Sequence, residues 1–304
     1  MKKIIELIAT GSGKSPEKLE KAINLIENLG FSPRASKTIF GEHPLYANTD
    51  QKRLENLIDA LYAEDSDIIW CLDGGSGTIR LLPHLGRLVP PAKPKLVIGL
   101  SDVTALLVFL SQKWNWQVVH APPASYAALN KLTPEAFDLL IEVIQGKTKT
   151  LSYDNLVPLN PIAKKNQGIE GRLTGGNMSL IEYSLGTSWQ IETQDRILFF
   201  EDINEAAYRI AERLEHLKQA GIFKHVKAVL FGDFSHEEKE KQQPSLVDFV
   251  LKDFAEHCEA PCFSNLPVGH KDYCRPLIIN LEATLTTGPK GKLVQQIAGN
   301  GGLS

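Results

Sequence analysis

Short apolar runs alternate with helical patterns along the first half of the chain. The runs at residues 4–9, 68–72 and 96–100 have the length and composition of buried strands. Apolar residues recur at helical spacing over residues 16–29 and 50–63. This alternation predicts a parallel sheet with helices on its faces. We therefore expect an α/β fold for this half of the chain.

Single residues mark the ends of the predicted helices. Ser15 is a suitable N-cap for the helix over residues 16–29, Pro16 suits its first turn, and Gly30 ends it. A further helical pattern covers residues 79–85. These local signals agree with the alternation of strands and helices.

The second half of the chain is more mixed. Residues 197–201 and 226–231 are typical of strands, and residues 206–220 are typical of a helix. Strand-like stretches follow at residues 277–285 and 292–297. This half therefore shows no regular alternation of strand and helix.

A segment of different character lies between the two halves. Over residues 146–168, glycine, prolines and lysines fall among short runs that keep no sustained period. Such a composition is typical of a connection between domains. We expect an α/β domain over residues 1–148, a connection over residues 149–168 and a second domain over residues 169–304.

Composition narrows the classes of function. The chain has 304 residues, 43% of them hydrophobic, and a net charge of −3 without a long run of one sign. This charge gives no footprint for nucleic acid or for an anionic membrane surface. No segment approaches the length of a membrane span, and Glu6 interrupts the first apolar run, which favours a strand over a signal peptide. The four cysteines are few and unevenly placed, so we expect reduced thiols and a cytoplasmic protein.

The most informative stretch is the corner around Ser101. The apolar run before it turns at Gly99, and a helical pattern begins after it. A serine at a sharp strand-to-helix corner is exposed and lies beside free helix N–H groups, which can stabilise an oxyanion. The alternative is that Ser101 or Asp102 only caps the helix.

Two glycine loops follow predicted strands. Gly11-Ser12-Gly13-Lys14-Ser15 resembles the end of a nucleotide-binding P-loop, but Ile8 stands where that motif requires a glycine. An NTPase is therefore one alternative, and a polar turn before a capped helix is the other. Gly74-Gly75-Ser76-Gly77 could bind an anion or place a backbone N–H opposite Ser101. Both loops would lie at the carboxyl ends of parallel strands, where α/β sheets place their sites.

An activated serine needs an imidazole base and a carboxylate that orients it. His270, one of eight histidines, lies in a turn-rich stretch, and Glu201 ends an apolar run where an ionised carboxylate needs a partner. The alternatives are a solvated loop histidine and a salt bridge from Glu201 to Arg209 or Arg213. A zinc site is a further alternative, although its residues lack a close Cys-x-x-Cys pair: His257, Cys258, Cys262, His270 and Cys274.

Five stretches in order carry a resemblance to a known family: Gly-Gly-Ser-Gly-Thr-Ile-Arg-Leu-Leu-Pro (74–83), Gly-Leu-Ser-Asp-Val-Thr-Ala-Leu (99–106), Gly-Arg-Leu-Thr-Gly-Gly-Asn-Met-Ser-Leu (171–180), Leu-Phe-Phe-Glu-Asp-Ile-Asn-Glu (198–205) and Leu-Pro-Val-Gly-His (266–270). The chain resembles the LD-carboxypeptidases, or muramoyltetrapeptide carboxypeptidases, a serine peptidase family that includes the microcin C immunity hydrolases. The resemblance covers nearly the whole chain.

The resemblance implies a Ser-Glu-His triad of Ser101, Glu201 and His270. It implies an oxyanion hole made by the backbone N–H groups of Asp102 and Gly75. It also implies a C-terminal β-rich α+β domain, an active site between the two domains, a homodimer, and no metal or organic cofactor. The expected reaction is hydrolysis of an L,D-amide bond that releases the terminal D-alanine of murein tetrapeptide during cell-wall recycling.

The chain departs from the family pattern beside the predicted nucleophile. The family usually has Arg-Gly-Gly-Tyr-Gly where this chain has Asp73-Gly74-Gly75-Ser76-Gly77. A carboxylate cannot make an arginine's contacts to an anionic peptide, so Asp73, Gly74 and Ser76 are the candidates that set substrate choice. The alternatives are an amide hydrolase acting on a peptidyl-nucleotide antibiotic and a binding module without turnover.

Overall fold

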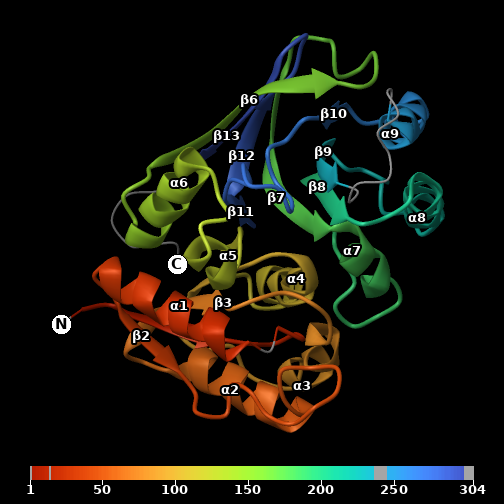
Figure 1. The fold of residues 1–304 in the computed structure, drawn as a ribbon. Helices are drawn as coiled ribbons and strands as arrows, with labels where there is room; N and C mark the ends of the chain where they lie inside the picture. The colour runs from red at the N-terminus through yellow and green to blue at the C-terminus, as the bar shows by residue number, and fades with distance from the viewer. Residues whose placement is uncertain (1, 14, 236–244, 298–304) are drawn as a thin grey trace.

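The computed structural model describes residues 2–13, 15–235 and 245–297. Figure 1 shows two lobes, a lower one built on an open sheet and an upper one built on a barrel. The α/β class expected from the sequence is confirmed. Within the described ranges, no helix is long and apolar enough to cross a membrane.

The lower lobe is a six-stranded sheet in the order β11-β5-β4-β3-β1-β2. All neighbouring strands in it run parallel except β11, which is antiparallel to β5. Its strands are β1 (Ile4–Ile8), β2 (Ser32–Ala35), β3 (Ser66–Cys71), β4 (Leu96–Gly99), β5 (Val118–His120) and β11 (Leu277–Ile279). The predicted parallel sheet is thus confirmed, with one late strand added at its edge.

The first helix of the lower lobe, α1, begins and ends where the local signals predicted. The Ser15 side chain accepts a hydrogen bond from the Lys18 N–H at the start of α1, and Gly30 follows that helix with φ +86°. The helices that precede the barrel strands in the chain are α1 (Pro16–Asn28), α2 (Asp50–Tyr62), α3 (Leu82–Leu85), α4 (Thr104–Lys113), α5 (Ala124–Ala128) and α6 (Pro134–Gln145).

The helix expected over residues 79–85 is divided. A 3-10 turn, η1 (Thr78–Arg80), comes first, and α3 begins anew at Leu82. Pro83 has no N–H to donate, so it is accommodated only in the first turn of a helix. The division therefore follows from Pro83.

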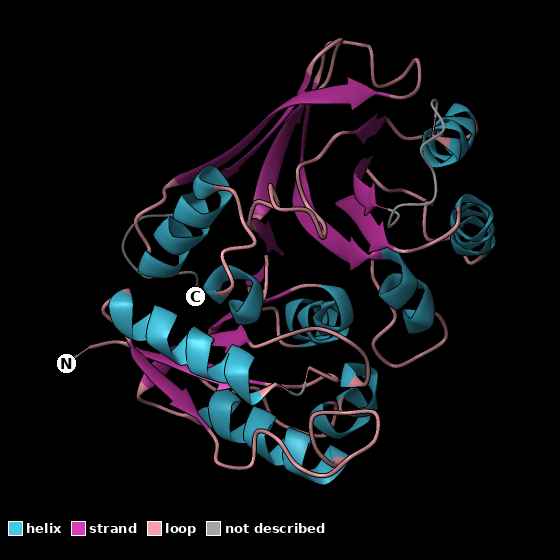
Figure 2. Ribbon diagram, viewed as in Figure 1, coloured by secondary structure: helices cyan, strands magenta, loops and turns pink. Residues whose placement is uncertain are grey.

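The upper lobe is a closed barrel in the order β10-β6-β13-β12-β7-β8-β9. Figure 2 shows long strands gathered in this lobe, with helices beside them. The helices α7 (Met178–Ser184), α8 (Ala207–Gln219) and α9 (Leu246–Glu256) lie outside it. Its strands are β6 (Thr150–Pro158), β7 (Gly168–Asn177), β8 (Arg196–Ile203), β9 (Ala228–Ser235), β10 (Cys262–Ser264), β12 (Glu282–Thr286) and β13 (Gly291–Gln296). The expected β-rich second domain is confirmed.

Two features differ from the expected boundaries. The segment at 149–168 contains β6, which pairs with β13 and β10, so this part of the predicted connection belongs to the barrel. The segment at 277–285 divides at Asn280, which has φ +67°, into β11 of the lower sheet and β12 of the barrel. The chain therefore crosses between the lobes more than once.

Candidate active site

The structure has the sharp strand-to-helix corner expected at Ser101, although the residue is half-buried and not exposed. Ser101 has φ +62°, a left-handed conformation that few residues without glycine's freedom adopt. It follows β4 and opens a 3-10 turn, η2 (Ser101–Val103), that leads into α4. A Cβ on Gly99 would lie 2.6 Å from Cγ1 of Val103, so the corner closes only with glycine there. Strain of this kind is typical of functional positions.

The capping alternative is not supported at this corner. Among the described residues, neither η2 nor α4 has a side-chain cap. The Asp102 carboxylate instead accepts hydrogen bonds from Thr78. Helix capping therefore does not explain the left-handed conformation of Ser101.

The glycine loop after β3 lies directly against Ser101. A Cβ on Gly74 would be 3.1 Å from Cβ and 3.3 Å from Oγ of Ser101. Gly75, with φ +97°, and Ser76 are both exposed, and the Ser76 N–H donates to Oγ of Ser12 at 3.2 Å. The two glycine loops and the serine corner thus meet at one edge of the sheet, as expected from parallel strands.

Glu201 and His270 form a buried pair. Nδ1 of His270 lies 2.8 Å from Oε2 of Glu201, and the two side chains are 7% and 0% exposed. Arg213 pairs with Glu205 and Glu182. Arg209 donates to the Tyr208 hydroxyl. The alternatives of a solvated histidine and of a Glu201 salt bridge to Arg209 or Arg213 are therefore not supported.

Charge and burial act in opposite directions on this pair. Burial alone lowers the pKa of His270, but the charge and hydrogen bond of Glu201 outweigh it, and the pKa of His270 is raised above its usual range. Burial raises the pKa of the Glu201 carboxyl, and the imidazole opposes that rise. An imidazolium formed at His270 is therefore stabilised where it stands.

The segment after Ser101 packs against the strand next to Glu201. Asn177, at the end of β7, is in register with Glu201 on β8. The Asn177 N–H donates to Oγ1 of Thr104, the first residue of α4, at 3.2 Å. A Cβ on Gly176 would be 2.5 Å from Cγ2 of Thr104, so the backbone of β7 touches α4.

Figure 1 shows α4 between the sheet and the barrel, beside α7. The serine corner and the Glu201–His270 pair thus lie on either side of one contact between the lobes.

A second carboxylate fixes this contact. Asp202 accepts from Nδ2 of Asn177 at 2.9 Å and from the N–H and Oγ of Ser179 at 3.0 and 2.7 Å. Sequence reasoning assigned no role to Asn177 or Asp202. Both lie inside stretches that carry the family resemblance, 171–180 and 198–205, which was the available signal.

Asp73 is engaged within the protein. Its carboxylate forms an ion pair with Lys18 of α1 and accepts the Gly74 N–H at 3.1 Å. Where the family usually has an arginine, this chain thus has a carboxylate whose charge is balanced by Lys18.

The metal and nucleotide alternatives gain no support. The described ranges contain no group of three or more histidine, cysteine, aspartate or glutamate residues placed to hold a metal ion. Cys274 Sγ accepts the Gly269 N–H, and His270 is bonded to Glu201. In the P-loop-like stretch, a Cβ on Gly13 would lie 2.3 Å from Cβ of Asp73, and Lys14 lies outside the described residues.

Comparison with known proteins defines the family. Residues 5–121 match the LD-carboxypeptidase N-terminal domain, and residues 170–285 match the LD-carboxypeptidase C-terminal domain. A Rickettsia conorii protein provisionally named a carboxypeptidase is 38% identical over 296 residues, which are 96% of this chain and 91% of that protein. The chain belongs to the LD-carboxypeptidase family. The resemblance stated from the sequence is therefore confirmed.

Other relatives of this LD-carboxypeptidase agree with that assignment. The murein tetrapeptide carboxypeptidase of Pseudomonas aeruginosa is 28% identical over 271 residues, 88% of this chain and 87% of that protein. The crystal structure of muramoyltetrapeptide carboxypeptidase from Oxalobacter formigenes is similar with a TM-score of 0.82 at 25% identity, covering 96% of this chain and 98% of that one. MccF in complex with glutamyl sulfamoyl guanosine shares the fold, with a TM-score of 0.82 at 17% identity over 97% of each chain.

Proposed function

We propose that this member of the LD-carboxypeptidase family is a serine peptidase that hydrolyses an L,D-amide bond and releases the terminal D-alanine of murein tetrapeptide. The observation that carries the proposal is the buried Glu201–His270 pair across the lobe contact from the strained Ser101 corner. Names of relatives, a murein tetrapeptide carboxypeptidase among them, support the substrate class.

In this proposal the three residues have separate roles. Glu201 holds the Nδ1–H of His270, which leaves Nε2 free to accept the Ser101 proton. Ser101 then attacks the carbonyl on the L-residue side of the bond. His270 returns the proton to the leaving D-alanine amine and afterwards activates the water that releases the acyl group.

The oxyanion formed in each step needs hydrogen-bond donors. The backbone N–H groups of Asp102 and Gly75 are the proposed pair, one at the corner and one on the exposed part of the glycine loop. Loss of one such donor typically slows an acyl-transfer enzyme about 100- to 1000-fold. Asp73, Gly74 and Ser76 border the same space and remain the proposed determinants of substrate choice.

The first test is incubation with murein tetrapeptide, followed by mass spectrometry for loss of one alanine. The wild-type protein should release it, and Ser101→Ala should not, with an unchanged circular dichroism spectrum. Turnover by Ser101→Ala would overturn the proposed mechanism.

A fluorophosphonate probe separates chemistry from substrate. Labelling of the wild-type protein without release of alanine would keep the serine mechanism and reject this substrate, and a peptidyl-nucleotide conjugate would then be tested in its place. An unlabelled wild-type protein would instead indicate a binding module. We also propose a homodimer, to be tested by light scattering, and a cytoplasmic location, which the four free cysteine thiols support.

A further inference from the structure

The carboxylate of Asp102 is buried directly after the proposed nucleophile. Asp102 is 3% exposed, and its Oδ2 accepts from Oγ1 of Thr78 at 2.6 Å and from the N–H of Thr78 at 3.0 Å. Burial raises the pKa of this carboxyl, and the hydrogen bonds from Thr78 oppose that rise. A buried acid is costly unless it is well paired, so its position here calls for an explanation.

Three loops converge on this carboxylate. Ser101 and Asp102 follow β4, Thr78 ends the glycine loop after β3, and Thr10 follows β1, with its Oγ1 2.8 Å from Oγ1 of Thr78. A Cβ on Gly11 would lie 2.7 Å from Oδ2 of Asp102 and 2.3 Å from the Gly74 carbonyl oxygen. Only a glycine therefore lets the first loop approach the other two.

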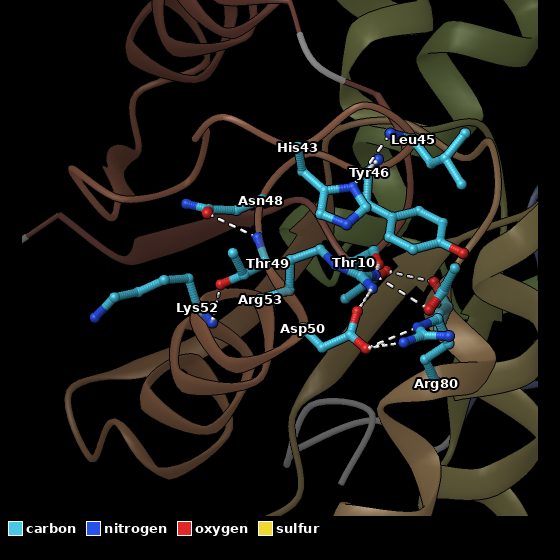
Figure 3. Close-up of polar contacts among 12 residues, drawn as sticks. Thr10, His43, Leu45, Tyr46, Asn48, Thr49, Asp50, Lys52, Arg53 and Arg80 are labelled. Atoms are coloured by element: carbon cyan, nitrogen blue, oxygen red, sulfur yellow. Dashed lines mark hydrogen bonds and ion pairs between the residues drawn. The ribbon is translucent and has the colours of Figure 1, made fainter.

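Arg53 binds two of the same loops. Its side chain is 0% exposed, and Nη1 donates to the carbonyl oxygen of Gly77 at 3.1 Å. The same nitrogen donates to the carbonyl oxygen of Thr10, which lies beside Arg53 in Figure 3. Its charge also lowers the pKa of Asp102. The glycine loop is thus attached at adjacent residues, at Gly77 by the buried guanidinium of Arg53 and at Thr78 by the buried carboxyl group of Asp102.

We propose that Asp102 is a positioning residue for the oxyanion hole. Its backbone N–H is one proposed donor, and its carboxylate fixes the glycine loop that carries the other, at Gly75. The inference rests on the proposed serine mechanism and deepens it. A loop this rich in glycine loses more conformational freedom when it is fixed than other loops do, so the anchor at Thr78 serves to pre-organise the donor.

The decisive variants are Asp102→Ala and Asp102→Asn. Asp102→Ala should lower kcat about 100-fold with KM changed less than about threefold, because a donor displaced by about 1 Å acts mainly in the transition state. Asp102→Asn keeps an oxygen that can accept from Thr78, so it should recover about a tenth or more of wild-type kcat. Affinity for a peptide aldehyde, whose adduct with Ser101 places an oxyanion in the hole, should fall in parallel with kcat.

The matched control is Glu6→Ala. Glu6 is also a buried carboxylate of the lower sheet, paired with Arg34 and remote from the proposed site, so its loss should lower the melting temperature and leave kcat unchanged. If Asp102→Ala does not fold, Thr78→Val, which removes one donor at similar volume, should lower kcat about tenfold. Unchanged aldehyde affinity in the folded variants, or a rise in KM at constant kcat, would overturn the inference. Turnover by Ser101→Ala would instead overturn the mechanism on which it rests.

Discussion

Nδ1 of His270 lies 2.8 Å from Oε2 of Glu201, although the two residues are 69 positions apart in the chain. The pair is buried at the lobe contact, where little solvent screens the carboxylate. Burial would lower the pKa of His270, and the carboxylate reverses that effect, so the net shift is upward. A base must be neutral to accept a proton, so activity should rise with pH through this raised pKa.

The Glu201→Gln variant tests this relationship. The acid limb of kcat/KM should lie above pH 6.5, the ordinary value for histidine, in the wild-type protein and at lower pH in the variant. The rate at the optimum should also fall on the order of 1000-fold, because the imidazole loses its orienting acceptor. Glu205→Gln is the matched control, since Glu205 lies four residues on and pairs with Arg213 instead. An unshifted acid limb in Glu201→Gln would show that His270 is not the base.

A methyl group at position 74 should block the site without unfolding the protein. In Gly74→Ala the new Cβ would lie 3.1 Å from Cβ and 3.3 Å from Oγ of Ser101, which is tight but not a severe clash. Gly74 lacks the positive φ of its neighbour Gly75, so alanine fits its backbone. We expect kcat/KM to fall about 100-fold and probe labelling to slow in proportion.

Gly86→Ala provides the control for that substitution. Gly86 ends α3 with φ −62°, and the nearest atom to its added Cβ would be 3.6 Å away, an ordinary contact. Both variants should melt within a few degrees of the wild-type protein. A fully active Gly74→Ala variant would place the reacting groups elsewhere than beside Ser101.

Local signals predicted the elements that local interactions build. The helix α1 was found because Ser15, Pro16 and Gly30 mark its ends, and each acts within a few residues of itself. The strand β6 was missed because its buried residues, Leu151, Tyr153 and Leu156, do not keep a two-residue period throughout. Asn155, with φ +63°, lies where the register with β13 shifts, and this irregularity obscured the pattern.

The site shows the same division between local and distant interactions. The corner of Ser101 and the charge of Glu201 at the end of an apolar run each allowed two interpretations, and the family resemblance favoured the catalytic one. The partners of Asp102 and Asp202 were not recognisable, because Thr78 and Ser179 reach them through contacts between loops and strands separated by 24 and 23 positions. Sequence patterns thus identified the proposed reacting groups, whereas the groups that hold them in place depend on tertiary packing.

The Lys18–Asp73 ion pair should tune the affinity for acidic peptides. Asp73 adjoins Gly74, and its charge is balanced by Lys18. Asp73→Asn leaves a net positive charge near the site, and Lys18→Met leaves a net negative one. KM for a peptide with a free carboxylate should therefore fall in the first variant and rise in the second. The effect is on the order of 1 kcal/mol, or about fivefold.

High salt provides the internal control for these two variants. Salt screens partly exposed charges, so the ratio of each variant's KM to that of the wild type should approach one at about 1 M salt. The side chains are 34% and 16% exposed, so each variant should lose less than about 1 kcal/mol of stability. Shifts of KM in the same direction would show that charge at this position does not act on the substrate.

His120 should make folding stability depend on pH. It is 0% exposed on β5, its ring meets Phe199 edge-on at 5.2 Å, and neither ring nitrogen has a hydrogen-bond partner in the part of the chain that the structure describes. Burial lowers its pKa from 6.5 to about 3, and the charge of His270 adds to this effect.

The folded protein therefore keeps His120 neutral where the unfolded chain binds a proton. Above pH 6.5 His120 is neutral in both states and does not make the free energy of unfolding depend on pH. As pH falls from 6.5 toward 3, only the unfolded chain binds the proton, so the free energy of unfolding falls by up to about 1.4 kcal/mol per pH unit. In His120→Phe this contribution disappears, so urea unfolding at pH 7, 5 and 4 should show a shallower loss than in the wild-type protein. At pH 7 the free energy of unfolding of the variant should be no more than about 1 kcal/mol below that of the wild type. The substitution removes two unpaired polar atoms and keeps an aromatic ring against Phe199. An identical pH dependence in the two proteins would mean that His120 is protonated, or paired, in the folded state.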